Sequence, residues 1–262
     1  MKLTLEDLQL KGKKVLMRVD FNVPLSKTGE IADDSRIQAS LPSIQYILDH
    51  GASLILMSHL GRPKAKPDPQ FSLAPCAKRL SELLGKPVLF APDCIGPAVE
   101  KMASHLKAGQ ILLLENVRFH EGEEEPEKDP SFVQALAGLG DLYVNDAFGT
   151  AHRAHASTAF IAKLFPHKAA MGSLMEKELF FLSPLLHNPK QPFFAILGGA
   201  KISTKAGVIQ SLLKKVDALY LGGAMSCTNI PASRSTIFVS RISASGVSAI
   251  EGTSKTSIAS AQ

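Results

Sequence analysis

The sequence predicts an α/β protein in which a parallel sheet carries helices on both faces, followed by a partial second α/β domain. Two observations lead to this fold class. Short apolar runs alternate with longer amphipathic segments along most of the chain. The short runs are apolar throughout rather than at every second position, which is typical of strands buried on both faces. A repeated strand and helix order then favours a parallel sheet.

Seven apolar runs have the length of strands. They span Lys13–Val19, Ser53–Met57, Val88–Phe90, Ile111–Leu114, Leu142–Val144, Phe193–Leu197 and Ala218–Leu221. The segments between them carry apolar residues at helical spacing, as at Ile37, Leu41 and Ile44 in the first one. These predicted helices span Arg36–His50, Leu73–Leu84, Ile95–Leu106, Phe132–Leu139 and Thr204–Val216.

The same pattern predicts the domain organisation. Residues 1–172 form the first domain, residues 173–188 form a helix between domains, and residues 189–228 begin the second domain. Pro184 is expected to end or kink that helix. Residues 229–262 are rich in serine and lose the strand and helix order, which predicts an aberrant, disordered tail that resembles a low-complexity linker or an out-of-frame translation. The acidic run Glu121–Lys128 is expected to be a solvated loop.

Composition argues against two classes of partner. The net charge of +5 agrees with a basic pI of about 9.0, but the chain has no block of Lys and Arg, no Trp and only three Tyr, so nucleic acid is not expected. No run approaches the roughly 18 apolar residues of a membrane span. Three cysteines without C-x-x-C spacing indicate reduced thiols, so we expect a cytoplasmic protein. We also expect a monomer.

Charged and polar residues follow several predicted strands. In an open parallel sheet, ligands bind beyond the carboxyl ends of the strands. Arg62, Arg118 and Arg153 follow three different strands, and Arg36 begins the first helix. Guanidinium groups bind phosphate through paired hydrogen bonds, so these four residues predict a site for a phosphorylated ligand.

Other polar residues at this edge have two interpretations. Asp20 and Asn22 stand two apart, so on an extended segment they share a face and could bind the hydroxyls of a small ligand. They could equally form a turn before Pro24. The histidines at this edge lack the spacing of a familiar metal site and are expected to form hydrogen bonds with phosphate or with the backbone, so no metal ligand is predicted. They are His59, His152 and His155.

A glycine-rich turn follows the sixth predicted strand. Gly198, Gly199 and Lys201 stand at the start of a helix, with Lys205 one turn later. Amides at a helix N-terminus attract phosphate, and lysine adds a full positive charge. The turn does not match the Walker A pattern.

Five motifs taken together resemble the phosphoglycerate kinase family. In chain order they are RVDFNVP (18–24), SHLGRP (58–63), LLENVRF (113–119), NDAFGTAHRAH (145–155) and LGGAKISTK (197–205). The resemblance extends over Met1–Met225. It implies two Rossmann-like domains joined by a long helix, and reversible phosphoryl transfer between 1,3-bisphosphoglycerate and ADP, giving 3-phosphoglycerate and ATP in glycolysis, with magnesium.

The resemblance also implies roles for individual residues. The 3-phosphoglycerate site corresponds to Asp20, Phe21, Asn22, Arg36, His59, Leu60, Gly61, Arg62, Arg118 and Arg153. The nucleotide site corresponds to Lys201, Lys205, Gly222 and Gly223, which would bind MgATP or MgADP, although Ala224 replaces a third glycine. Arg36 and Lys201 are the residues expected to meet the transferring phosphoryl group.

The segment after Met225 departs from the family pattern, and the family's acidic magnesium ligand is not found there. Two alternatives therefore stand beside an active kinase. One is a catalytically inactive fragment that binds 3-phosphoglycerate. The other is a basic protein that binds nucleic acid. Since the acceptor carboxylate has a pKa near 4 and is already ionised at neutral pH, the kinase reaction requires no general base.

Overall fold

The computed structural model describes residues 2–26, 28–199, 205–222, 236–243 and 246–252. The chain divides into two compact units, residues 1–180 and 181–262. The division falls inside the helix α6 (Ser173–His187), which lies within the segment 173–188 where the sequence predicts a helix between domains. Pro184 lies inside this helix and does not end it. None of the described helices is long and apolar enough to cross a membrane.

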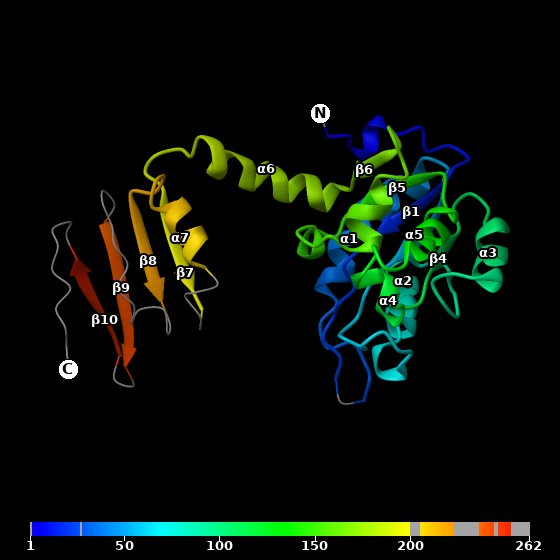
Figure 1. Ribbon diagram of the computed structural model, residues 1–262, viewed down its shortest axis with the longest axis horizontal. Helices are drawn as coiled ribbons and strands as arrows, with labels where there is room; N and C mark the ends of the chain where they lie inside the picture. The colour runs from blue at the N-terminus through cyan, green and yellow to red at the C-terminus, as the bar shows by residue number, and fades with distance from the viewer. Residues whose placement is uncertain (1, 27, 200–204, 223–235, 244–245, 253–262) are drawn as a thin grey trace. The chain divides into compact units, whose positions relative to one another are not determined.

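Unit 1 is built on a parallel sheet of six strands (Figure 1). Their order across the sheet is β3-β4-β2-β1-β5-β6. The strands are β1 (Lys14–Arg18), β2 (Ser53–Met57), β3 (Val88–Phe90), β4 (Ile111–Leu113), β5 (Leu142–Asn145) and β6 (Ala169–Met171). The strand β6 was not predicted, because Ala-Ala-Met is too short and too weakly apolar to resemble a strand. The α/β fold class is otherwise confirmed.

The helices of unit 1 lie near the predicted positions, with one addition. They are α1 (Ser35–Asp49), α2 (Ala74–Leu84), α3 (Pro97–Ser104), α4 (Glu121–Glu124) and α5 (Pro130–Ala137). The short helix α4 occupies part of the predicted solvated loop. That prediction was wrong for Glu123, whose side chain is completely buried.

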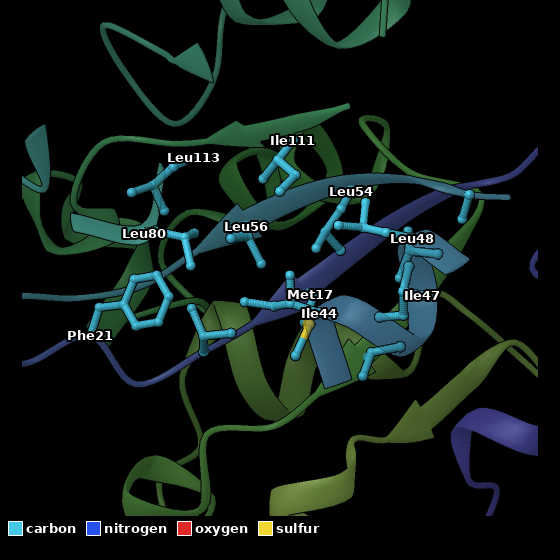
Figure 2. Packing of buried hydrophobic residues seen from close by; sticks show 14 of the residues in the cluster. Met17, Phe21, Ile44, Ile47, Leu48, Leu54, Leu56, Leu80, Ile111 and Leu113 are labelled. Atoms are coloured by element: carbon cyan, nitrogen blue, oxygen red, sulfur yellow. The ribbon is translucent and has the colours of Figure 1, made fainter. Parts of the chain in front are cut away.

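The register of the strands separates two hydrophobic cores, one on each face of the sheet. Met17 lies beside Leu56 and Val144, and these side chains pack with α1 and α2. Figure 2 shows this cluster, with Met17 and Leu56 facing Ile44. The next residue back, Leu16, belongs to the opposite core with α3 and α5. Burial on both faces explains why the strands are continuous apolar runs.

A buried carboxylate marks the start of α6. Asp146, which follows β5, is completely buried, and its Oδ1 accepts a hydrogen bond from the Met175 amide at 3.0 Å. Its Oδ2 has no partner among the described residues. Burial raises the pKa of Asp146. Gly172 packs directly against it, since a Cβ there would lie 2.4 Å from the Asp146 carboxyl carbon.

Unit 2 contains a sheet of four strands in the order β10-β9-β8-β7. The strands are β7 (Phe194–Gly198), β8 (Ala218–Gly222), β9 (Thr236–Ser243) and β10 (Gly246–Gly252), with the helix α7 (Ala206–Leu212). Ile209 of α7 packs on Leu219 and Leu221. The other face of β7 is open, because Phe194 is 59% exposed and Ile196 is 84% exposed.

The strands β9 and β10 differ from the predicted disorder at residues 236–243 and 246–252, and the rest of the predicted tail, residues 229–235, 244–245 and 253–262, lies outside the described residues. β9 is parallel to β8, and β10 pairs antiparallel with β9. The run Thr236-Ile-Phe-Val-Ser carries the β-branched and aromatic residues that favour strands. The serine content of the surrounding segment concealed this signal.

Candidate functional site

The site lies at the carboxyl edge of the sheet in unit 1. All five strand pairings in this sheet are parallel, so the loops that follow the strands meet at one edge. β1 lies between β2 and β5, and the chain leaves β1 toward β2 but leaves β5 toward β6. Open α/β sheets usually bind their ligands at such a reversal of direction. We call this position, between the loops that follow β1 and β5, the crevice.

Asp20 and Arg36 form an ion pair at this crevice. Arg36 Nη1 donates to Asp20 Oδ2, and Asp20 Oδ1 lies 4.0 Å from His59 Nδ1. Arg36 is at the start of α1 and remains about half exposed. Gly149, which follows β5, gives the space that this arrangement requires, because a Cβ there would lie 2.7 Å from Asp20 Oδ2.

Asn22, Gly61 and Arg118 form a second connected group. The amide of Gly61 donates to Asn22 Oδ1 at 2.9 Å, and Arg118 Nη1 donates to the Gly61 carbonyl at 2.8 Å. Gly61 has a φ of +61°, a conformation that favours glycine, and the Phe71 ring leaves no room for a Cβ. The loops after β1, β2 and β4 are thereby joined through one glycine.

Arg118 is a buried cation with spare hydrogen-bonding capacity. Its side chain is 6% exposed, and Nη2 lies 3.1 Å from Glu124 Oε1. Its Nε has no hydrogen-bond partner among the described residues. Burial is the main cause that lowers the pKa of Arg118, and the charge of Arg153 acts in the same direction. A guanidinium group in this state favours an anionic ligand.

His59 is a neutral imidazole at physiological pH. Its side chain is buried, and burial is the main cause that lowers its pKa to about 2, followed by the charges of Arg18, Arg118 and Arg153. Its Nδ1 lies 3.1 Å from Arg18 Nη2, which makes Nδ1 the acceptor in this pair. His59 can therefore form hydrogen bonds with a ligand but adds no positive charge.

The remaining residues predicted for this site differ in their exposure. Phe21 and Leu60 are buried, and they hold the loops through their backbones: the Phe21 amide donates to Ser58 Oγ at 2.8 Å, and the Leu60 carbonyl accepts from Asn116 Nδ2 at 2.7 Å. Arg153 is partly buried, and its charge acts on both His59 and Arg118. Arg62 is exposed, next to Gly61.

Three residues behind the site were not predicted to belong to it. Arg18 is 1% exposed, and its Nε donates to Ser157 Oγ at 2.8 Å. Ser157 donates from Oγ and from its amide to the two oxygens of Glu123. The sequence contained a signal for Arg18, because it stands two residues before Asp20 on the same extended segment. Within a run of glutamates, no signal distinguishes Glu123 from its neighbours.

The predicted nucleotide residues are only partly described. Lys201 and Gly223 lie outside the described residues. Lys205 donates to the Gly198 carbonyl, and Gly222 ends β8 opposite Gly198 of β7. A lysine and closely spaced glycine backbones fit an anionic phosphate chain. Among described residues 205–222 the one carboxylate is Asp217, which binds the Phe193 amide before β7 and so does not fit a magnesium ligand at the carboxyl edge.

Comparisons with known proteins support the resemblance. The family model for phosphoglycerate kinase matches residues 5–257, which extends beyond the motifs that end near Met225. A phosphoglycerate kinase of Koribacter versatilis is 56% identical over 237 residues, covering 88% of this chain and 58% of the relative. A cytosolic phosphoglycerate kinase of Triticum aestivum is 58% identical over 225 residues, covering 86% of this chain and 55% of the relative.

Solved structures agree with this assignment. A phosphoglycerate kinase from Coxiella burnetii has a TM-score of 0.73 at 39% identity, covering 86% of this chain and 55% of that chain. One from Pyrococcus horikoshii has a TM-score of 0.77 at 34% identity, covering 86% and 56%. The chain thus spans little more than half the length of these relatives. On its motifs, its fold and these matches, the chain belongs to the phosphoglycerate kinase family.

Proposed function

We propose that unit 1 binds 3-phosphoglycerate and 1,3-bisphosphoglycerate, and that the chain serves the phosphoglycerate kinase reaction. The observation that carries this proposal is the convergence of Asp20, His59 and Arg118 from three strands on one crevice, with Arg36 beside them. Each of these groups matches a property of a small, phosphorylated hydroxy acid.

Arginines bind the fixed phosphate of the ligand in this proposal. Arg118 is buried, its Nε is unpaired among the described residues, and its carboxylate partner Glu124 is 53% exposed. A buried charge is costly unless it is fully paired, so a phosphate dianion would lower the free energy of this site. Arg153 and Arg62 add positive charge, and neutral His59 adds a hydrogen bond.

The other end of the ligand meets Asp20 and Asn22. Asp20 presents carboxylate oxygens, which accept hydrogen bonds from a hydroxyl group. The loops that carry these residues are held together by backbone hydrogen bonds of Phe21, Leu60 and Gly61. Because Asn22 Oδ1 is already bound to the Gly61 amide, its remaining hydrogen-bonding capacity is the NH₂ group, which suits a carboxylate or carbonyl oxygen.

The reaction requires positioning and charge neutralisation more than proton transfer. The carboxylate oxygen of 3-phosphoglycerate attacks the terminal phosphorus, and the bond from that phosphorus to the ADP oxygen breaks. Arg36 at the crevice and Lys201 neutralise the oxygens of the phosphoryl group as it moves. Bound MgATP would supply this phosphoryl group, and MgADP would accept it in reverse.

Lys201, Lys205, Gly222 and Gly223 contact the nucleotide phosphates in this proposal. No residue is assigned to magnesium, because the described carboxyl edge of unit 2 offers no carboxylate. A cytoplasmic monomer is also proposed, and the relative from Triticum aestivum, which is named a cytosolic enzyme, supports the location.

Calorimetric titration of the purified chain with 3-phosphoglycerate tests the binding part. Arg118→Ala should abolish the binding heat, whereas Arg79→Ala, which removes a surface arginine paired with Asp34 and Glu82, should leave it unchanged. An absence of binding by the unaltered chain, or equal binding by both variants, would refute the proposed site.

A coupled assay with MgATP and 3-phosphoglycerate tests the catalytic part separately. Turnover that is lost in Arg36→Ala supports a working kinase. Binding without turnover would instead identify the alternative, a fragment that binds the acid but does not transfer phosphate. A gel shift with DNA or RNA that weakens strongly with salt would favour a nucleic-acid-binding protein.

A further inference from the structure

A second cluster of chemically active side chains lies at the other end of the same sheet edge. Asp93 and Cys94 follow β3, and His120 follows the neighbouring strand β4 through a short turn, η3 (Val117–Phe119). One ligand atom from each, a carboxylate oxygen, Sγ and a ring nitrogen, all lie within 4.8 Å of one another. The proposed substrate site uses none of the three.

We infer that Asp93, Cys94 and His120 form a binding site for Zn²⁺ or a cation of similar softness. Thiolate, imidazole and carboxylate are the three ligand types that zinc takes in proteins. Cys94 as a thiolate and Asp93 as a carboxylate carry two negative charges, which neutralise a divalent ion. Since Cys94 is completely buried, this neutrality removes the electrostatic penalty of placing the ion there.

Two of the three ligand atoms are already in contact, and the sulfur lies within 4.8 Å of both. His120 Nε2 lies 2.5 Å from Asp93 Oδ1, and the His120 ring is stacked on Phe132 with centroids 4.9 Å apart. The Cys94 amide donates to the same Asp93 oxygen at 2.6 Å, and Cys94 Sγ lies 3.0 Å from the Glu115 carbonyl oxygen. Each of the three side chains thus has a contact with a neighbouring amide, carbonyl or ring.

Occupation requires small movements. Zinc ligands at tetrahedral angles stand about 3.3 Å apart, so Asp93 and His120 must separate by a few tenths of an ångström to about 1 Å. The Asp93 side chain is 47% exposed and His120 is 26% exposed, which allows the movement and gives the ion a path from solvent. The Cys94 proton leaves on binding, and water or the Glu115 carbonyl completes the coordination.

Such a site would join the loops after β3 and β4. Arg118 stands two residues before His120, so the ion would also hold the segment that carries this arginine. Magnesium prefers six oxygen ligands, which this cluster does not offer, and the site is therefore distinct from any site for nucleotide-bound magnesium. The inference does not depend on the proposed function.

The test is a titration of the chelator-treated, reduced chain with Co²⁺, followed by optical absorption, and then with Zn²⁺ as competitor. We expect a thiolate-to-cobalt charge-transfer band that Zn²⁺ abolishes and that Mg²⁺ leaves unchanged. Cys94→Ser should remove the band, whereas Cys76→Ser, which alters the other buried thiol of unit 1, and Cys227→Ser should retain it. His120→Gln should weaken zinc binding at least as much as the roughly tenfold to hundredfold that loss of a supporting residue costs.

Asp93→Asn provides a variant at a half-exposed position, for the case in which Cys94→Ser does not fold. It should keep the circular dichroism of the unaltered chain and lower zinc affinity. The inference is overturned if the unaltered chain gives no band, if the band depends on Cys227 instead of Cys94, or if Asp93→Asn and His120→Gln both bind zinc as tightly as the unaltered chain.

Discussion

Glu123 accepts two hydrogen bonds from a single residue, Ser157. Ser157 Oγ lies 2.7 Å from Glu123 Oε1, and the Ser157 amide lies 3.0 Å from Oε2. The same hydroxyl accepts from Arg18, which contacts His59. A buried acid in α4 therefore fixes the orientation of a histidine at the proposed substrate site.

We expect Glu123→Gln to weaken 3-phosphoglycerate binding and to destabilise unit 1. The new NH₂ group faces a donor, so a buried hydrogen bond is lost at a cost of about 1–3 kcal/mol. Titration calorimetry and urea unfolding measure the two effects. Glu121→Gln, an exposed position in the same helix, is the matched control and should change neither. Equal behaviour of the two variants would contradict a positioning role for Glu123.

Gly149→Ala should reduce binding through Asp20. The added methyl group would lie 2.7 Å from Asp20 Oδ2, so the carboxylate must turn away from Arg36. We expect a loss of affinity for 3-phosphoglycerate with little loss of helix content. Gly138→Ala, whose methyl group meets atoms no closer than 3.5 Å, is the control. Unchanged affinity in Gly149→Ala would show that the ion pair is not required.

His59 predicts a loss of stability in acid. Its folded pKa of about 2 lies below the unfolded value near 6.5, so the unfolded chain binds the proton first. The contribution of His59 to the free energy of unfolding is fully present above about pH 6.5. It falls as the pH drops below that value, by up to about 1.4 kcal/mol per pH unit. Urea unfolding between pH 7 and about pH 5 gives the free energy of unfolding at each pH. That free energy should change less steeply with pH in His59→Gln than in the unaltered chain. Identical slopes would contradict the lowered pKa.

Asp146 acts in the opposite direction. Because burial raises its pKa above the unfolded value near 3.9, the folded chain binds this proton first, and the carboxyl group stabilises the fold less as pH rises through its folded pKa. Asp146→Asn should remove this dependence, which urea unfolding between about pH 4 and pH 7 measures. If the free energy of unfolding of Asp146→Asn changed with pH above pH 4 as it does in the unaltered chain, the raised pKa of Asp146 would be refuted.

Gly172→Ala should be strongly destabilising. Its Cβ would fall 2.4 Å from the Asp146 carboxyl carbon, and such overpacking typically costs 1–3 kcal/mol. The start of α6 would shift, since the Met175 amide binds the same carboxyl group. A melting temperature equal to that of Gly138→Ala would show that the contact relaxes freely.

The sequence predicted the sheet of unit 1 well because both of its faces are buried. Leu16 and Met17 belong to opposite cores, so the whole run is apolar and easy to identify. β6 lacked this signal, and β9 was hidden in a serine-rich segment. The sequence pattern predicted a helix that begins at residue 173. No local feature indicated that the preceding residue must be Gly172, because the Asp146 carboxyl group after β5 leaves no room for a Cβ there.

The position of a residue at the carboxyl edge was predictable wherever that residue follows a strand, and its role in binding stays a prediction. Asp20, His59 and Arg118 follow β1, β2 and β4, and strand ends meet in a parallel sheet. Glu123 and Ser157 were not predictable, because their pairing joins positions 34 apart through the tertiary fold. The approach of His120 to Asp93 is likewise a product of strand order, since β3 and β4 are neighbours.

The open face of β7 has a practical consequence for handling the protein. Phe194 and Ile196 present aromatic and aliphatic surface to water in the folded state. Fluorescent dyes that detect exposed apolar surface should therefore bind before any heating, so a high starting signal in a thermal shift experiment would reflect native unit 2. Such a signal should not be taken as the mark of a molten globule, whose diagnosis also requires the loss of near-ultraviolet circular dichroism.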